Sequence, residues 1–230
     1  MTQLVIGLGE VGSAIQKILS CDGLDSFKSI YPTLDLYDTI HICFPYSASF
    51  KEDVIAYREK FGATLVIVHS TVPLGTCDEL GAVHSPIRGI HPNLEEGVRT
   101  FVKFFGGTRA HDAAAIFREQ GIKTMACDTA RETEALKLWD TTIYGWNILI
   151  EKAIKAYCER NELDFRTVYT LANATYNEGY ALLGRPEYSK YVLKDYRGEI
   201  GGHCVKENWE LLDDPIAEIS KTLHKQITDS

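Results

Sequence analysis

The chain has 230 residues, of which 45% are hydrophobic and 24% are charged, a composition typical of a globular protein large enough for one or two domains. Its 24 basic and 32 acidic residues give a net charge of -8, and no Lys/Arg cluster interrupts the acidic excess, so we expect no nucleic-acid partner. No stretch approaches the roughly 20 apolar residues that cross a bilayer, and Met1 leads directly into a predicted strand, so we expect no membrane partner and a cytoplasmic location.

The first half of the chain alternates between strands and helices. Residues 4–6 form an apolar run that ends in a glycine-rich turn, and residues 13–19 follow with helical periodicity. Strands are also predicted at 39–44, 64–69 and 82–84, with a crossover helix at about 50–61. Because such strands are apolar along most of their length, we expect an α/β domain over residues 1–127, with a Rossmann-like, mostly parallel sheet and helices on both faces.

The second half is predicted to be an all-helical domain over residues 128–230. Thr129 and Glu132 have the spacing of a capping box, and an apolar stripe that includes Trp139 and Trp146 continues to about Arg160. This pattern predicts one long central helix, with further helices at about 165–183 and 205–225. The stripe is wider than a chain of this size is expected to cover, so we expect a homodimer through the helix at 130–160.

The cysteines and histidines do not suggest a metal site. The six cysteines contain no C-x-x-C pair, which argues against a disulfide framework and a zinc ribbon; they stand at positions 21, 43, 77, 127, 158 and 204. The histidines at 69, 84, 91 and 203 lack helical i, i+4 spacing. We expect most of these side chains to have packing, capping or turn roles.

The glycine-rich turn is the first candidate site. Gly7, Gly9 and Gly12 match G-x-G-x-x-G, in which the first glycine permits a tight turn, the second lets backbone approach a pyrophosphate, and the third permits close helix packing. The turn follows a strand and opens a helix, whose N-terminus favours phosphate. We therefore predict a dinucleotide site; the alternative is an α/β turn that binds no ligand.

The residue that would hold the adenosine ribose is less clear. An acidic residue is expected about 20 positions after the glycines, at the end of a strand. Asp22 and Asp25 are the candidates, and neither ends an obvious strand. NAD is the expected cofactor, with NADP left open. Only 20 residues separate Leu19 from Ile40, so the adenine-binding half is expected to be abbreviated.

Ser70 and Thr71 follow the strand at 64–69, at the carboxyl edge where open α/β sheets bind ligands. Their hydroxyls are candidates for contact with a nicotinamide ribose or a substrate, although an ordinary turn has the same composition. Lys137 is a cation within the long apolar helix. It is either a functional cation or the partner of Glu134 in a solvent-side pair.

The segment 201–204 (GGHC) contains the candidate nucleophile. Paired glycines permit close approach of backbone to a ligand, and the residues after Cys204 look helical. A thiolate at a helix N-terminus is favoured by the helix dipole, so Cys204 is a candidate reactive thiol. The alternative is a buried structural cysteine beside a turn.

Together these segments resemble the UDP-glucose/GDP-mannose dehydrogenase family of nucleotide-sugar 6-dehydrogenases. The matching features, in order, are the glycine-rich turn, a strand ending near Pro45, and the segments 70–76 (STVPLGT), 105–107 (FGG), 134–138 (EALKL) and 201–204 (GGHC). The last segment resembles the branch that acts on N-acetylated UDP-hexosamines. The resemblance covers almost the whole chain but only the first two of the family's three domains.

The resemblance implies a role for each matching residue. Cys204 corresponds to the nucleophile, Lys137 to the cation that steadies the oxyanion, and Thr71 to the residue that helps to position water. It also implies a small-molecule substrate, such as a nucleotide sugar. The implied contacts to NAD come from Gly7, Gly9, Val11, Gly12, Pro45, Ser70 and Thr71.

Three positions depart from the family pattern. Thr141 stands where the family has asparagine, and Asn208 stands where it has an aspartate that assists proton transfer. Ile87 replaces the glutamate of the family's Pro-Glu pair. The nearby carboxylates of Glu207, Glu95 and Glu96 are the candidates for a substitute base.

The sequence therefore predicts an NAD(P)-dependent oxidoreductase that acts on a CH–OH group, oxidising a primary alcohol through a thiol adduct. Two alternatives stay open. One is a two-electron dehydrogenase of the β-hydroxyacid type, which also joins a Rossmann domain to a helical domain and uses a helical lysine. The other is a non-catalytic dinucleotide-binding protein. The thiol-adduct mechanism predicts two NADH per substrate, the two-electron dehydrogenase predicts one, and the non-catalytic protein predicts none.

Overall fold

The structure is a computed structural model that describes residues 1–89, 92–194, 200 and 203–228, with the backbone alone for residues 203, 204 and 228. The chain divides into two compact units, Met1–Lys137 and Leu138–Ser230.

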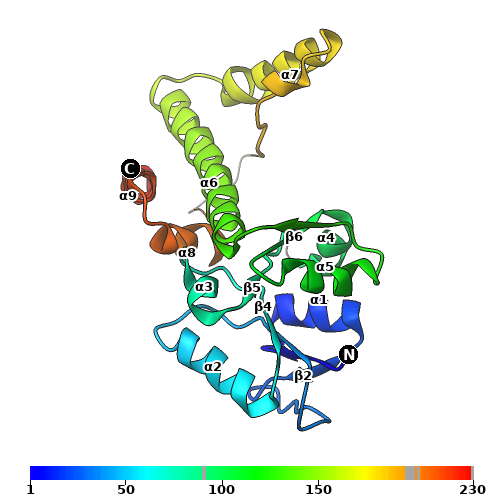
Figure 1. The fold of residues 1–230 in the computed structure, drawn as a ribbon. Coiled ribbons are helices and arrows are strands. Elements are labelled where there is room, and N and C mark those ends of the chain that lie inside the picture. The colour runs from blue at the N-terminus through cyan, green and yellow to red at the C-terminus, as the bar shows by residue number, and fades with distance from the viewer. Residues whose placement is uncertain (90–91, 195–199, 201–202, 229–230) are drawn as a thin grey trace. The chain divides into compact units, whose positions relative to one another are not determined.

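One sheet forms the centre of the first unit, and its strand order is β2-β1-β3-β4-β5-β6-β7 (Figure 1). Every neighbouring pair is parallel except β5 and β6, which are antiparallel. The predicted mostly parallel, Rossmann-like sheet is therefore confirmed. The strands described are β1 (Gln3–Ile6), β2 (Asp22–Leu24), β3 (Thr39–Ile42), β4 (Leu65–Val68), β5 (Val83–His84), β6 (Lys103–Gly106) and β7 (Thr124–Cys127).

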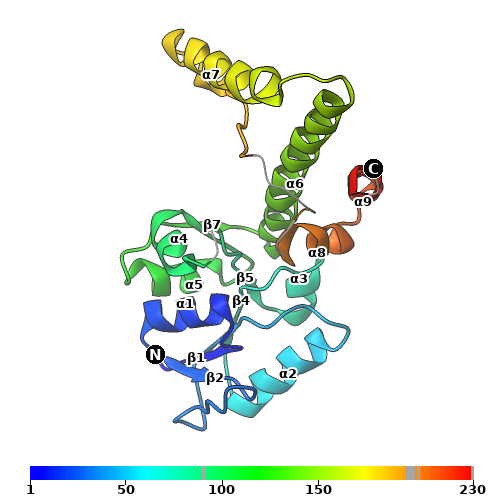
Figure 2. The same cartoon turned by 180° about the vertical axis from the view of Figure 1, so that it is seen from behind.

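Helices cover both faces of this sheet, as predicted (Figure 2). Side chains alternate along each strand, so that Val5 packs in the core under α1, α4 and α5, while Leu4 and Ile6 pack in the core under α2 and α3. The helices of this unit are α1 (Glu10–Leu19), α2 (Phe50–Phe61), α3 (Thr76–Leu80), α4 (Leu94–Thr100), α5 (Ala110–Arg118) and the start of α6 (Ala130–Arg160).

The connection between β2 and β3 contains no helix, because residues 25–38 form a loop. Asp22 holds this loop: its carboxylate accepts hydrogen bonds from the backbone and hydroxyl of Thr33 and from the hydroxyl of Tyr37. The expected abbreviation of this half of the domain is confirmed. Because β2 and β3 lie on opposite sides of β1, the strand order reverses at β1, the kind of switch point where open α/β sheets bind ligands.

The second unit is helical. The capping box at the start of α6 is present: the Glu132 carboxylate accepts from the Thr129 amide at 3.2 Å, and the Thr129 hydroxyl accepts from the Glu132 amide at 3.4 Å. The unit contains most of α6, then η1 (Arg166–Leu171, a π-helix), α7 (Ala172–Leu182), η2 (Pro186–Tyr188), α8 (His203–Leu211) and α9 (Pro215–Thr228). None of the helices described in either unit is long and apolar enough to span a membrane.

The single helix expected at 205–225 is instead two helices, α8 and α9. Pro215 cannot donate a backbone hydrogen bond to the preceding turn, and Asp214 accepts a hydrogen bond from the Ile216 amide at 2.9 Å. A new helix therefore begins at Pro215. Trp209 of α8 and Ala217 of α9 lie in one small core with Leu149 of α6.

Candidate functional site

The glycine-rich turn has two glycines that the fold requires and one that it does not. Gly7 has a φ of +87°, and a Cβ on Gly12 would lie 1.8 Å from the Gly7 carbonyl oxygen. Both positions therefore exclude other residues on conformational or steric grounds. A Cβ on Gly9, in contrast, would meet no atom within 4 Å. The space in front of Gly9 is open.

That open space is part of a cavity of about 490 Å³ at the N-terminus of α1. Gly9 is the residue before the helix and has no side chain with which to cap it, so backbone N–H groups of the first turn are available to an anion. A helix N-terminus after a glycine-rich turn is where dinucleotide-binding folds place a pyrophosphate. Its lining residues are Gly9, Glu10, Ser13, Ala14, Lys17, Lys28, Pro92 and Glu95.

Asp25 directly follows strand β2, so the expectation that no acidic candidate ends a strand is wrong. The strand was not recognised because it has only three residues, one of them glycine. The Asp25 carboxylate accepts from the Leu8 amide at 2.9 Å and from the Lys28 amide at 3.1 Å. The bond from Leu8 is the main cause that lowers the pKa of Asp25. Lys28, which the sequence did not single out, donates from Nζ to the Leu8 carbonyl.

The ends of β3 and β4 lie next to this turn. A Cβ on Gly7 would be 3.0 Å from the Phe44 amide nitrogen, and the Ser70 hydroxyl donates to the Phe44 carbonyl at 2.6 Å. Pro45 follows Phe44 and is exposed, while Ser70 and Thr71 are half-buried. The structure thus brings Gly7, Phe44 and Ser70 together at the carboxyl edge of the sheet.

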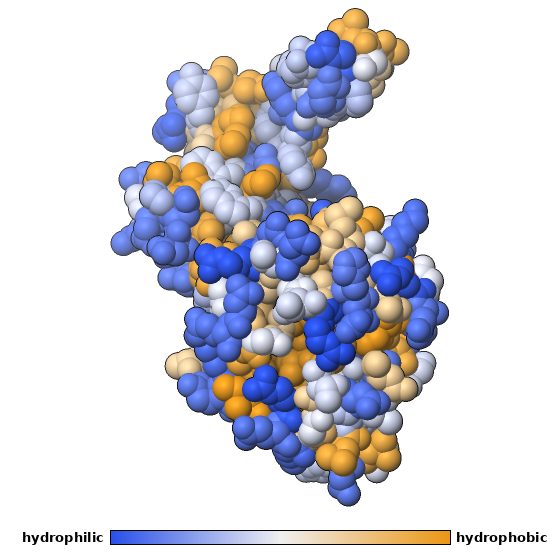
Figure 3. Space-filling model, in the orientation of Figure 1, coloured by the Kyte–Doolittle hydropathy of each residue, from blue (hydrophilic) through white to orange (hydrophobic). Residues whose placement is uncertain are grey.

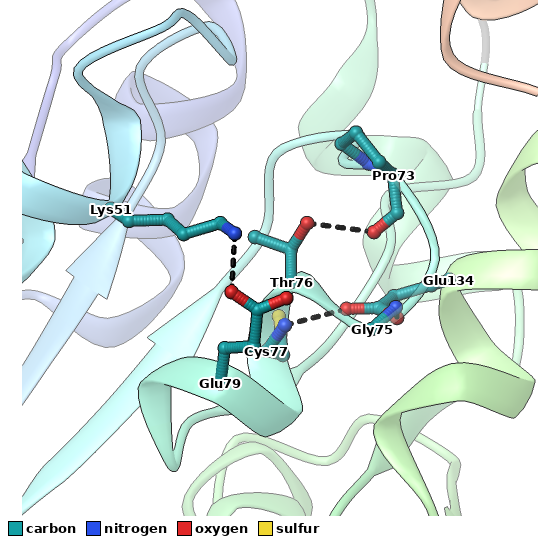
Figure 4. Close-up of polar contacts among 7 residues, drawn as sticks. All are labelled: Lys51, Pro73, Gly75, Thr76, Cys77, Glu79 and Glu134. Carbon is teal, nitrogen blue, oxygen red and sulfur yellow. Dashed lines mark hydrogen bonds and ion pairs between the residues drawn. The ribbon is translucent and has the colours of Figure 1, made fainter.

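The first turns of α6 are attached to the same edge at three points. The Glu134 carboxylate accepts from the Gly75 amide at 2.6 Å and from the Cys77 amide at 2.8 Å (Figure 4). Lys137 donates from Nζ to the Ile87 carbonyl at 3.0 Å. Because Glu134 is completely buried, the alternative of a solvent-side pair between Glu134 and Lys137 is wrong.

His84 provides the third attachment. Its Nε2 lies 3.2 Å from the Ser70 carbonyl oxygen and its Nδ1 lies 3.0 Å from the Thr133 hydroxyl. A carbonyl only accepts, so Nε2 carries the proton and Nδ1 accepts from Thr133. Burial lowers the pKa of His84 to about 3, which keeps the imidazole neutral.

A buried polar cluster is formed by His41 on β3, His69 after β4 and Lys103 on β6. The rings of His41 and His69 stack with centroids 5.4 Å apart, and Lys103 Nζ lies 3.3 Å from His69 Nδ1. Lys103 also donates to the carbonyls of Ser85 and Pro86, at 3.2 and 3.5 Å. Burial lowers the pKa of Lys103 to about 7 and that of His41 to about 3.

The remaining candidates are dispersed. Glu95 lines the cavity at α1 and pairs with Lys17 at 2.6 Å and with Arg99 at 3.2 Å, which lowers its pKa. Asn208 is buried in α8, and within the described part of the chain its Nδ2 has no hydrogen-bond partner.

The predicted nucleophile segment 201–204 is described only in part. Gly201 and Gly202 lie outside the described residues. Cys204 is in the first turn of α8, but its side chain is outside the described part. Among the described residues, no three His, Cys, Asp or Glu side chains gather as a metal site would require.

No protein-family model matches the sequence, and no curated protein matches it. The fold, in contrast, matches solved structures. A UDP-D-ManNAc dehydrogenase from Pyrococcus horikoshii is 16% identical, with a TM-score of 0.78 over 99% of this chain and 69% of that one. The UDP-N-acetyl-mannosamine dehydrogenase Cap5O from Staphylococcus aureus is 17% identical, with a TM-score of 0.72 over 100% of this chain and 68% of that one.

A smaller enzyme is also similar. The 3-hydroxyisobutyrate dehydrogenase from Mycobacterium tuberculosis is 13% identical, with a TM-score of 0.68 over 100% of this chain and 94% of that one. The fold that the resemblance implied is therefore confirmed: the chain has the Rossmann-type dehydrogenase fold that solved nucleotide-sugar dehydrogenases show over about two-thirds of their length.

Proposed function

We propose that the chain is an NAD(P)-dependent dehydrogenase that oxidises a primary alcohol, with a nucleotide sugar as the first substrate to test. The observation that carries the proposal is the open face of Gly9 at the cavity on α1, beside the strand ends that hold Ser70 and Thr71. A bound nicotinamide ring would accept the hydride that leaves the alcohol carbon. The chain's own residues then supply binding, orientation and charge.

The glycine-rich turn and α1 are proposed to hold the pyrophosphate, with Lys28 as a nearby cation. Asp25 is proposed to accept from the adenosine ribose, since it directly follows β2, and backbone N–H groups of Leu8 and Lys28 hold its carboxylate in place. A carboxylate at this position favours the hydroxyl of NAD over the phosphate of NADP. Val11, Pro45, Ser70 and Thr71 complete the proposed cofactor contacts.

Three residues are proposed to act on the substrate. The Cys204 thiolate would add to the aldehyde and hold it covalently, and the Lys137 ammonium would stabilise the oxyanion of that adduct. Loss of a second hydride from this adduct to a second NAD would convert it to a thioester, and Thr71 would position the water that hydrolyses the thioester. Asn208 cannot accept the proton of that water, so hydrolysis should be slow and an acyl-enzyme should accumulate unless Glu207, Glu95 or Glu96 acts as the base instead.

Gly9→Val tests the cofactor site by calorimetry with NADH. Because Gly9 faces open space, we expect this variant to keep the wild-type melting temperature and to lose NADH binding. Gly12→Ala is the matched comparison and should instead destabilise the fold, because its Cβ would overlap the Gly7 carbonyl. Unchanged NADH binding by Gly9→Val would place the cofactor elsewhere.

Intact mass spectrometry tests the chemistry. With NAD and UDP-N-acetylmannosamine or another primary alcohol, the wild type should show an acyl adduct that Cys204→Ala lacks. Asn208→Asp should speed turnover of the adduct by about 10²-fold, the effect of a general base. Cys204→Ala with full activity would contradict the proposal.

The second candidate is a two-electron dehydrogenase of the β-hydroxyacid type. Two observations favour it: the chain covers 94% of a hydroxyisobutyrate dehydrogenase, and an amide occupies position 208. The NADH produced per substrate separates the candidates, because this one predicts one NADH and the thiol mechanism predicts two. A yield of zero with every substrate would leave a non-catalytic dinucleotide-binding protein.

A further inference from the structure

Glu134 belongs to the 134–138 segment, in which the sequence assigned it no role beyond a pair with Lys137. Its side chain is completely buried, and its two oxygens accept backbone N–H groups from Gly75 and Cys77, at 2.6 and 2.8 Å. Gly75 ends the loop after β4 and Cys77 is in the first turn of α3, 59 and 57 residues away in sequence. Figure 4 shows the carboxylate reaching from α6 to the start of α3.

We propose that Glu134 is a positioning residue for the nicotinamide half of the dinucleotide, an inference that rests on the proposed function. The loop that it holds begins with Ser70 and Thr71, the residues proposed to contact that half. The carboxylate draws the far end of this loop against α6 and thereby sets where the two hydroxyl residues lie.

The two hydrogen bonds to the Glu134 carboxylate are expected to be strong. A buried carboxylate is costly unless hydrogen bonds replace its hydration, and bonds to a charged acceptor are the stronger kind. The loop also depends on the attachment, because Gly75 has a φ of +91° and its amide is directed at Glu134. Thr76 closes the turn by donating from its hydroxyl to the Pro73 carbonyl at 2.8 Å.

Two neighbouring residues of α6, Thr133 and Lys137, add further hydrogen bonds between this helix and the sheet edge. Thr133 donates to His84, which in turn donates to the Ser70 carbonyl. Lys137, one turn after Glu134, donates to the Ile87 carbonyl. Helix α6, which carries Lys137, is therefore hydrogen-bonded to both ends of the 70–77 segment: through His84 to Ser70, and directly to Gly75 and Cys77. These bonds hold the segment and Lys137 in one position relative to each other.

The glycine-rich turn does not share these bonds. Its conformation rests on Gly7, Gly12 and Asp25, and none of these contacts involves α6. Loss of the Glu134 carboxylate should therefore weaken a ligand that uses the 70–77 loop and spare a ligand that uses the glycine-rich turn alone. NADH is a ligand of the first kind, and ADP-ribose, which lacks nicotinamide, is one of the second.

The test compares the affinities of NADH and ADP-ribose for Glu134→Gln by calorimetry. An amide offers one acceptor oxygen and places its NH₂ against a backbone N–H. We expect NADH to bind about tenfold more weakly and ADP-ribose to change by less than about twofold. Glu79→Gln is the matched control on α3, because it removes an exposed carboxylate that pairs with Lys51, and it should change neither affinity.

Two further variants keep the proposal testable if Glu134→Gln folds poorly. Gly75→Ala leaves the carboxylate in place and strains the loop at its left-handed residue, so it should also weaken NADH selectively. Glu134→Asp, which keeps the charge, should restore part of the NADH affinity.

The possible failures are distinguishable. Equal weakening of NADH and ADP-ribose, or no weakening of either, would mean that Glu134 only stabilises the fold. Failure of the wild type to bind either ligand would instead overturn the dinucleotide site itself.

Discussion

Lys103 is a cation in an apolar interior. It is only 4% exposed, its Nζ lies 5.4 Å from the ring centre of Phe105 and 5.2 Å from that of Phe117, and no described carboxylate pairs with it. Burial lowers its pKa from 10.5 to about 7 in the folded protein. Its bonds to two carbonyls offset part of the cost of burying the amine.

The buried lysine makes stability depend on pH above neutrality. Between pH 7 and 10.5 the unfolded chain keeps a proton that the folded protein has released, so stability rises with pH by up to about 1.4 kcal/mol per unit. We expect Lys103→Met to remove this rise. Urea unfolding at pH 7.5 and 9.5 measures it, with the exposed Lys123→Met as the control. An equal rise in wild type and Lys103→Met would show that the amine is charged when folded.

At the scale of elements, three adjacent strands contribute buried histidines to the sheet. His41 is on β3, His69 follows β4, and His84 is on β5. Burial lowers the pKa of all three, to about 3 for His41 and His84. Their rings are neutral hydrogen-bonding groups that join strands to one another and, through His84, to α6.

Acid should therefore unfold the first unit. Below pH 6.5 the unfolded chain takes up protons that the folded histidines cannot, so stability is lost from pH 6.5 toward pH 3, by about 1.4 kcal/mol per unit for each histidine. Chemical denaturation at pH 7 and pH 5 should show this loss, and His84→Gln should reduce it. His111→Gln, on the exposed side of α5, should leave it unchanged. Equal stability of the wild type at both pH values would contradict the prediction.

At the scale of the whole molecule, apolar side chains are exposed on the helical unit (Figure 3). Among the exposed apolar residues of α6 are Ile143, Ile150 and Tyr157, which are 53%, 47% and 53% exposed and are spaced by seven residues. This spacing places them on one side of the helix, as in helix pairs that pack along a stripe. Helix α7 has no buried residue within this chain.

We propose that a second copy of the chain covers this stripe. Light scattering should give twice the 25.8 kDa of one chain. Ile150→Glu should shift the particle to 25.8 kDa at micromolar concentration, because a carboxylate would be buried in the contact. Glu159→Lys, at an exposed residue about two and a half turns after Ile150 and so on the opposite side of α6, should leave the dimer intact. A wild-type mass of one chain would refute the dimer.

The sequence alone determined the features that depend on neighbouring residues. The glycine-rich turn, the capping box of Thr129 and Glu132, and the apolar strands β1, β3 and β4 were all predictable, because each depends on residues within one strand or one helical turn. The abbreviated second crossover followed from the short distance between Leu19 and Ile40. The break at Pro215 was missed although its signal is local.

Only the tertiary structure decided the parts that join distant segments. Of the two acidic candidates for the ribose, the structure favours Asp25, which directly follows β2; the pairing of β2 with β1 is one that a three-residue strand does not reveal in the sequence. Glu134 is a helical residue that looks exposed in sequence, and its two partners lie nearly 60 residues earlier. Such roles escape sequence patterns because a buried carboxylate is stabilised by amides that only the packed fold brings to it.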